Sequence, residues 1–135
     1  MRMHIKLGLL VAALLSLASV AYATVGTPIQ GTPVGLEHDP EGIAVPGGKT
    51  DAKGNATFAM LKPGRYTVFV PDRSKFKGLV VILVVSVNDL PVVTSEPMKA
   101  GTGKGYAMDK AGRKLVFTVD KPGNALVVTV VDRGG

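Results

Sequence analysis

Apolar and polar residues alternate along the middle of this chain. Between residues 55 and 71 the apolar side chains occupy every second position in two runs: Ala56, Phe58 and Met60, then Tyr66, Val68 and Val70. Alternation with a period of two is typical of a β-strand with one buried face. The runs are joined by Lys62-Pro63-Gly64, where proline fixes φ and glycine supplies a positive φ at the next corner. This segment therefore predicts a β-hairpin.

Short apolar runs bounded by Gly, Pro, Asn and Asp continue through the rest of the chain. Similar turn residues recur around Lys121-Pro122-Gly123 and predict a second hairpin there. Turn signals spaced about 8–12 residues apart are typical of an all-β sandwich or barrel. We predict strands near residues 33–38, 43–48, 55–60, 65–71, 79–88, 91–95, 113–120 and 124–132.

One apolar run is too continuous for a strand with a wet face. It extends from Leu79 to Val87 and is interrupted only by Ser86. The run predicts a central strand covered on both faces, or a strand whose outer face pairs with another subunit. A self-assembling subunit that uses Leu79–Val87 as its interface is therefore one alternative for this protein, and a homo-oligomer stays open.

The segment 96–112 is rich in glycine and long for a sandwich loop. Long loops are often functional or mobile, and we predict a flexible loop here. If the protein binds a ligand through this loop, we expect Lys99, Lys104 and Tyr106 to contact it.

The first 23 residues have the layout of a secretory signal peptide. Arg2 and Lys6 are followed by an apolar segment, Leu7–Leu17, and by small residues around Tyr22. We expect a helical signal peptide over residues 1–23 and a single domain over residues 24–135. The prediction is a secreted or periplasmic protein with no transmembrane segment after cleavage, because the apolar run is shorter than a span of about 20 residues.

The composition narrows the chemistry further. The chain has no cysteine, so cysteine nucleophiles, redox centres and thiolate metal sites are excluded. Without Arg2 and Lys6, the 16 basic residues become 14 against ten acidic ones, a net charge of +4. This mild excess favours anionic envelope polymers or lipid headgroups over nucleic acid, which requires a dense basic surface.

A short segment, 73–77, interleaves one aromatic residue with three cations. Arg73, Lys75, Phe76 and Lys77 are candidates for contact with an anionic polysaccharide or a membrane surface. The alternative is a solvated loop in which Phe76 packs back on the core.

His38 is the one histidine after residue 23, and it lies among carboxylates at Glu37, Asp39 and Glu41. A single imidazole, without a second histidine, is a poor ligand set for zinc or copper. The same residues are also typical of an ordinary type I turn. A Cu(I) site of His38, Met98 and Met108 is an alternative, because thioether sulfur suits Cu(I). No Ser-His-Asp set is indicated. We expect no cofactor, no metal and no catalysis, with a copper-binding protein as the alternative.

Three further patterns carry a family resemblance. They are Gly31-Thr32-Pro33-Val34-Gly35-Leu36-Glu37, then Thr50-Asp51-Ala52-x-Gly54-x-Ala56-x-Phe58, then Leu61-x-Pro63-Gly64-x-Tyr66-x-Val68. Residues 31–72 thereby resemble the carboxypeptidase regulatory-like, or transthyretin-like (prealbumin-type), β-sandwich domains. The resemblance implies a Greek-key β-sandwich of seven or eight strands and a binding or structural accessory role without catalysis.

The related hydroxyisourate hydrolases end in Tyr-Arg-Gly-Ser and use several histidines, whereas this chain ends Val131-Asp132-Arg133-Gly134-Gly135. The sequence thus predicts an exported, non-enzymatic accessory module of the cell envelope. Its partner would be an envelope protein or a polysaccharide.

Overall fold

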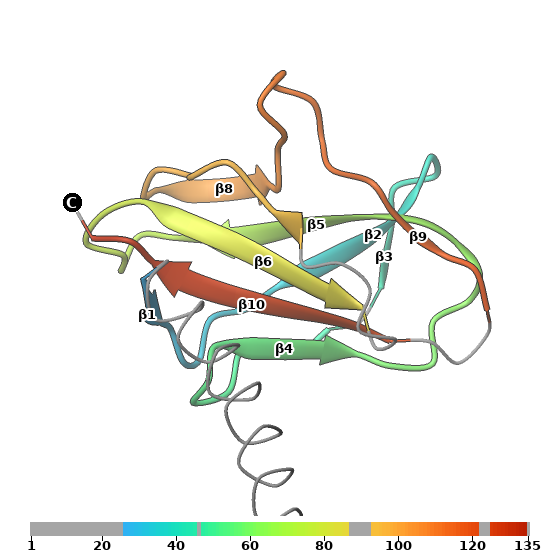
Figure 1. Cartoon of the computed structure of the whole chain (residues 1–135), viewed down its shortest axis with the longest axis horizontal. Coiled ribbons are helices and arrows are strands. Elements are labelled where there is room, and N and C mark those ends of the chain that lie inside the picture. Colours follow the sequence, from blue (N-terminus) through green and yellow to red (C-terminus); the bar gives the residue numbers. More distant parts are fainter. Residues whose placement is uncertain (1–25, 46, 87–92, 122–124, 135) are drawn as a thin grey trace, which may run out of the picture.

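The computed structural model describes residues 26–45, 47–86, 93–121 and 125–134. These residues form two antiparallel β-sheets packed face to face, so the predicted all-β sandwich is confirmed (Figure 1). The predicted signal peptide, residues 1–23, lies outside the described residues. Among the residues that are described, no helix is long and apolar enough to cross a membrane.

The described chain contains ten strands, more than the seven or eight predicted, partly because two of them are only two residues long. They are β1 (Thr27–Pro28), β2 (Gly35–Asp39), β3 (Ile43–Val45), β4 (Asn55–Phe58), β5 (Gly64–Asp72), β6 (Val80–Ser86), β7 (Val93–Thr94), β8 (Thr102–Tyr106), β9 (Phe117–Val119) and β10 (Leu126–Asp132).

The first sheet has the order β1-β10-β6-β7, and β4 also pairs with β10. The second sheet has the order β3-β2-β5-β8, and β9 also pairs with β5. The chain crosses from one sheet to the other after β1, β3, β4, β5, β7 and β9, so neighbouring strands are often distant in sequence. Such crossings are typical of Greek-key sandwiches.

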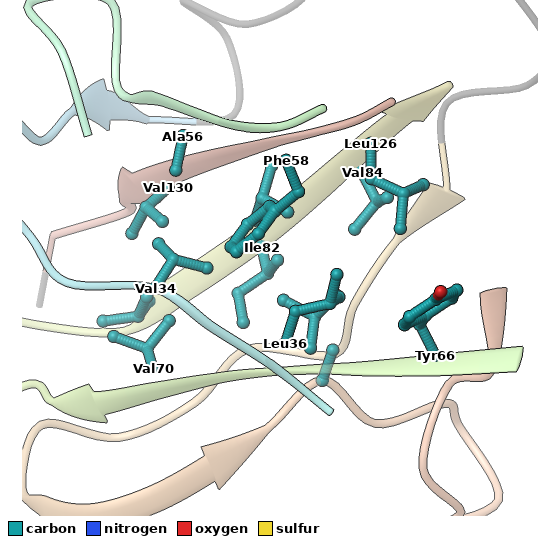
Figure 2. Close-up of a cluster of buried hydrophobic side chains, with 14 of the residues drawn as sticks. Val34, Leu36, Ala56, Phe58, Tyr66, Val70, Ile82, Val84, Leu126 and Val130 are labelled. Carbon is teal, nitrogen blue, oxygen red and sulfur yellow. The ribbon is translucent and has the colours of Figure 1, made fainter. Parts of the chain in front are cut away.

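The core fills the space between the sheets (Figure 2). Phe58 from the first sheet and Tyr66 and Val68 from the second are buried, and Phe117 is partly buried against the same cluster. The first sheet also contributes Ile82, Val84, Val128 and Val130 to this core. The alternation of apolar positions therefore identified the inward faces of β4 and β5 correctly at Ala56, Phe58, Tyr66, Val68 and Val70. It was wrong for Met60, which lies beyond the end of β4 and is exposed.

The two predicted hairpins are wrong, although their strands exist. β4 pairs with β10 in the first sheet, whereas β5 pairs with β2, β8 and β9 in the second. Likewise, β9 and β10 belong to different sheets. The segment between β4 and β5 crosses the sandwich, and Met60 within it has a φ of 57° and is 79% exposed. Turn residues predict where a chain bends, but not which sheet it enters next.

The apolar run at Leu79–Val87 forms β6, which lies between β10 and β7. Val80, Ile82 and Val84 face the main core, while Val81 and Leu83 form a separate buried cluster with Val131. Residues 80–84 therefore present neither an open strand edge nor an exposed apolar face within the described structure. This favours the central-strand interpretation; Val87 lies outside the described residues.

The predicted flexible loop at 96–112 contains β8, which pairs with β5. The loop prediction is therefore wrong for residues 102–106, because glycine is uncommon in strands and these residues carry no strand signal in the sequence. Gly105 is required by its close approach to Arg73. A Cβ at Gly105 would lie 2.3 Å from Nη1 of Arg73, so only glycine lets the guanidinium rest on the strand. A glycine in a strand often marks such a close approach.

Candidate anion-binding site

The predicted ligand residues Lys104 and Tyr106 lie on β8, on the outer face of the second sheet. Both bind Glu37 of β2: the Tyr106 hydroxyl donates to its carboxylate at 3.0 and 3.1 Å, and Lys104 Nζ lies 2.5 Å from Oε1. Glu37 is only 6% exposed. A buried carboxylate requires such donors, so these polar groups are already used within the fold.

Aromatic and cationic contacts complete this arrangement, which we name the Glu37 cluster: Glu37, Phe69, Lys104, Tyr106 and Lys114. The rings of Phe69 and Tyr106 are 5.6 Å apart, Lys104 Nζ lies 5.1 Å from the Phe69 ring centre, and Lys114 Nζ lies 3.9 Å from the Tyr106 ring centre. The hydrogen bond from Lys104 lowers the pKa of the Glu37 carboxyl, with the Tyr106 hydroxyl acting in the same direction. The cluster ties β2 to β8 across β5.

The third predicted ligand residue, Lys99, has a different role. Its backbone carbonyl accepts a hydrogen bond from Nε of Arg73 at 3.0 Å. The guanidinium also donates from Nη1 to the carbonyls of Val70 and Gly103, at 2.6 and 2.9 Å. Arg73 therefore fastens the end of β5 to the start of β8, and these donors are not directed to an external surface.

The prediction that Phe76 contacts an anionic surface is wrong. This side chain is 8% exposed and belongs to the core cluster, so it is not placed for a membrane or polysaccharide. Lys75 and Lys77, its neighbours, are exposed. The segment thus keeps its cations outside and its aromatic ring inside, as the alternative interpretation predicted for Phe76.

Lys75 and Lys77 meet a third cation, Arg133, from the end of β10. The three line an open hollow of about 520 Å³ together with Asp132, Gly134 and residues around β1, namely Gly26, Thr27 and Ile29. We call this the cationic hollow. The loop after β5 and the C-terminal end of β10 lie on the same side of the sandwich (Figure 1).

The carboxylate of Asp132 holds the backbone around the cationic hollow in place by accepting hydrogen bonds from main-chain amides. Its Oδ2 accepts from the amide of Lys77 at 3.0 Å, and its Oδ1 accepts from the amide of Gly134 at 2.9 Å. The amide of Arg133 donates to the carbonyl of Leu79 at 2.8 Å. Both carboxylate oxygens therefore hold main-chain donors and fix the segments from which the cations project.

No ion pair in the described part of the chain involves Lys75, Lys77 or Arg133. The preceding turn is also fixed. Asp72 accepts from the amide and the hydroxyl of Ser74, at 3.0 and 2.6 Å, and these bonds, with a smaller contribution from the charge of Lys75, lower the pKa of its carboxyl. An anchored loop that presents unpaired ammonium groups is suited to binding an anion.

Two residues of the alternative copper site, His38 and Met98, lie far apart. Nδ1 of His38 lies 2.6 Å from Oε2 of Glu41, and its ring contacts Tyr66 edge-on near the start of β5. Met98 instead bridges to Val80, close to Arg73 beyond the end of β5. About 20 Å of extended β5 separates these positions. Within the described residues, no group of three or more His, Cys, Asp or Glu side chains is placed to hold a metal ion.

The sequence predicted Lys75 and Lys77 as site residues, but not Asp132 and Arg133. No spacing rule joins residues 75–77 to residues 132–133, because the pairing of β10 with β6 brings them together. The one signal was the dipeptide Asp-Arg itself, which follows an apolar run at both 72–73 and 132–133.

The chain matches no protein-family model, no curated protein and no solved structure. The resemblance to carboxypeptidase regulatory-like domains therefore stays a prediction, carried by residues 31–72 alone.

Proposed function

We propose that this protein is an exported, non-enzymatic binding module of the cell envelope, and that the cationic hollow is its contact with an anionic envelope polymer. The observation that carries the proposal is the convergence of Lys75, Lys77 and Arg133 around one open hollow. Export rests on the signal-peptide pattern of residues 1–23.

The chemistry of the hollow supports an oxyanion as the recognised group. Lysine supplies a compact point charge, and arginine supplies a planar fork that matches a phosphate or carboxylate with two parallel hydrogen bonds. The hollow is open to solvent, which suits a group carried on a polymer chain. Because all three cations are exposed, each ion pair is worth only about 0.2–1 kcal/mol, and useful affinity requires their combination.

The side chains of the hollow favour binding over catalysis. Its one carboxylate, on Asp132, holds two backbone amides and is committed to the fold. The cations around it are suited to attracting a negative group, and the described lining residues include no paired nucleophile and base.

The direct experiment is affinity electrophoresis of the purified protein through gels that contain polyphosphate, polygalacturonate or neutral dextran. We expect retardation by one or both polyanions and none by dextran, with the retardation lost as salt screens the charges. Equal mobility in all three gels would rule the proposal out.

A further inference from the structure

A second surface lies near the opposite end of β5 from the cationic hollow. It is a largely apolar groove of about 500 Å³, between β3 of the second sheet and the segment 59–62 that crosses between the sheets. Its apolar lining includes Ile43, Ala44, Val45, Met60 and Leu61. About 20 Å of extended chain, from Tyr66 to Asp72, separates it from the loop that carries Lys75.

Two large apolar side chains in this groove are exposed to solvent. Ile43 is 64% exposed and Met60 is 79% exposed. Exposed apolar side chains that adjoin one another and are rimmed by polar groups often mark an interaction site. The rim here is polar: it consists of His38, Glu41 and Lys62.

The backbone at Met60 adds an independent observation. Its φ of 57° is in the left-handed region, where a side chain costs about 1–2 kcal/mol relative to glycine. Methionine at this position gains little burial in the isolated chain, because most of its side chain faces water. The position therefore combines a strained backbone with a flexible thioether, a side chain that adapts well to a partner surface.

The backbone of β3 offers the means of binding. β3 is the outermost strand of the second sheet, and in the described part of the chain nothing pairs with its other edge. Its register with β2 is continuous, from Leu36 opposite Val45 to His38 opposite Ile43. An extended peptide can add to such an edge through main-chain hydrogen bonds while alternate side chains enter the adjoining groove.

The size and charge of this surface identify the occupant. β3 has three residues, so pairing two copies of the chain at this edge gives a small contact, whereas stable interfaces bury roughly 800 Å² on each partner. At the rim, Glu41 is engaged by His38 at 2.6 Å, while Lys62 has no ion-pair partner among the described residues. An acidic residue of a bound segment would therefore complement the ammonium group of Lys62.

From these contacts we infer that the β3 edge and the apolar groove beside it dock an extended segment of a partner protein, with apolar side chains at alternate positions and an acidic residue that meets Lys62. The inference goes beyond the proposed function, since it concerns a second surface with different chemistry. A module with both surfaces would attach a partner protein to an anionic polymer.

The test selects linear peptides from a displayed random library against the immobilised, purified protein, and then titrates a synthetic copy of the enriched sequence. We expect enrichment of alternating apolar residues with one acidic residue. Ile43→Glu and Met60→Glu should each weaken binding about tenfold or more, as truncation of a central contact does. Lys62→Glu should shift the selected charge from acidic to basic.

Leu79→Glu is the matched control, since Leu79 is 37% exposed and lies outside the groove. It should leave peptide binding unchanged, and circular dichroism should show the same fold for all variants. Bound peptide should also slow amide hydrogen exchange at residues 43–45. Three results would overturn the inference: no enriched sequence, binding that survives both Ile43→Glu and Met60→Glu, or a concentration-dependent dimer that Ile43→Glu abolishes. A polymer-binding failure at Lys75 and Lys77 would leave this result untouched.

Discussion

Tyr106 donates its hydroxyl hydrogen to the carboxylate of Glu37 at 3.0 and 3.1 Å, although 69 residues separate the two in sequence. The strands that carry them, β8 and β2, do not pair with each other, because β5 lies between them. The contact therefore fastens the two flanking strands over the outer face of the second sheet. Since Glu37 is buried, loss of its donors leaves a charge without compensation.

Tyr106→Phe should lower the free energy of unfolding by about 1–2 kcal/mol, because it removes a hydrogen bond to a charged group. Urea unfolding of the wild type, Tyr106→Phe, Glu37→Gln and the double variant gives the coupling energy between the two side chains. We expect the double variant to lose less than the sum of the single losses. Simple additivity would show that the contact is not formed in solution.

Stability should depend on Glu37 in acid. The Lys104 hydrogen bond lowers its folded-state pKa below the ordinary value of 4.5. Its contribution is therefore present above about pH 4.5 and is lost as the pH falls through the lower folded-state value. Unfolding free energies from about pH 6 down to pH 3 should fall more steeply for the wild type than for Glu37→Gln. Parallel curves would contradict this assignment.

Gly105→Ala should disrupt the Arg73 contacts, because the new methyl group would lie 2.3 Å from Nη1 and 2.6 Å from Cζ. Displacement of the guanidinium breaks hydrogen bonds to backbone carbonyls, at a cost of about 1–3 kcal/mol. Gly48→Ala is the control, since a Cβ there meets nothing within 4 Å. Thermal melts should show a clearly lower melting temperature for Gly105→Ala and little change for Gly48→Ala. Equal decreases would show that the Arg73 contacts do not stabilise the fold.

Phe58→Ala should destabilise the sandwich by about 3–5 kcal/mol, as large-to-small changes in a core do. Phe58 is 2% exposed, and it packs so closely on residue 47 that a Cβ at Gly47 would lie 2.1 Å from its ring. Val116→Ala, at a 38% exposed position, is the comparison. Chemical denaturation of both variants measures the difference, and losses of similar size would place Phe58 outside the core.

The sequence predicted strand positions well and strand partners poorly. Alternation at Ala56, Phe58, Tyr66 and Val68 reports which face of each strand meets the core, and the structure agrees. The same residues carry no information about the partner strand. For that reason the turn at Pro63-Gly64 predicted a hairpin, whereas in the structure the chain passes there from one sheet to the other.

The missed strand and the missed site residues have a common cause. β8 contains two glycines, Gly103 and Gly105, and their role depends on Arg73, roughly 30 positions earlier, whose guanidinium donates a hydrogen bond to the carbonyl of Gly103. Arg133 joins Lys75 and Lys77 only because β10 pairs with β6. Such relationships arise from long-range pairing, and a local pattern does not contain them.

The central claim is that Lys75, Lys77 and Arg133 act together on an anionic polymer. The direct measurement is the affinity of the purified protein for polyphosphate and polygalacturonate by titration calorimetry, in the wild type and in two charge-matched triple variants. The first replaces Lys75, Lys77 and Arg133 with alanine; the second replaces the exposed Lys49, Lys53 and Lys121, which lie outside the hollow.

We predict that the hollow variant loses at least about tenfold in affinity for the polymer that binds, since three ion pairs together supply roughly 1.4 kcal/mol or more. The second variant should lose much less, although its net charge is the same. Equal losses in the two variants would show that only overall charge matters and would contradict a site at the cationic hollow.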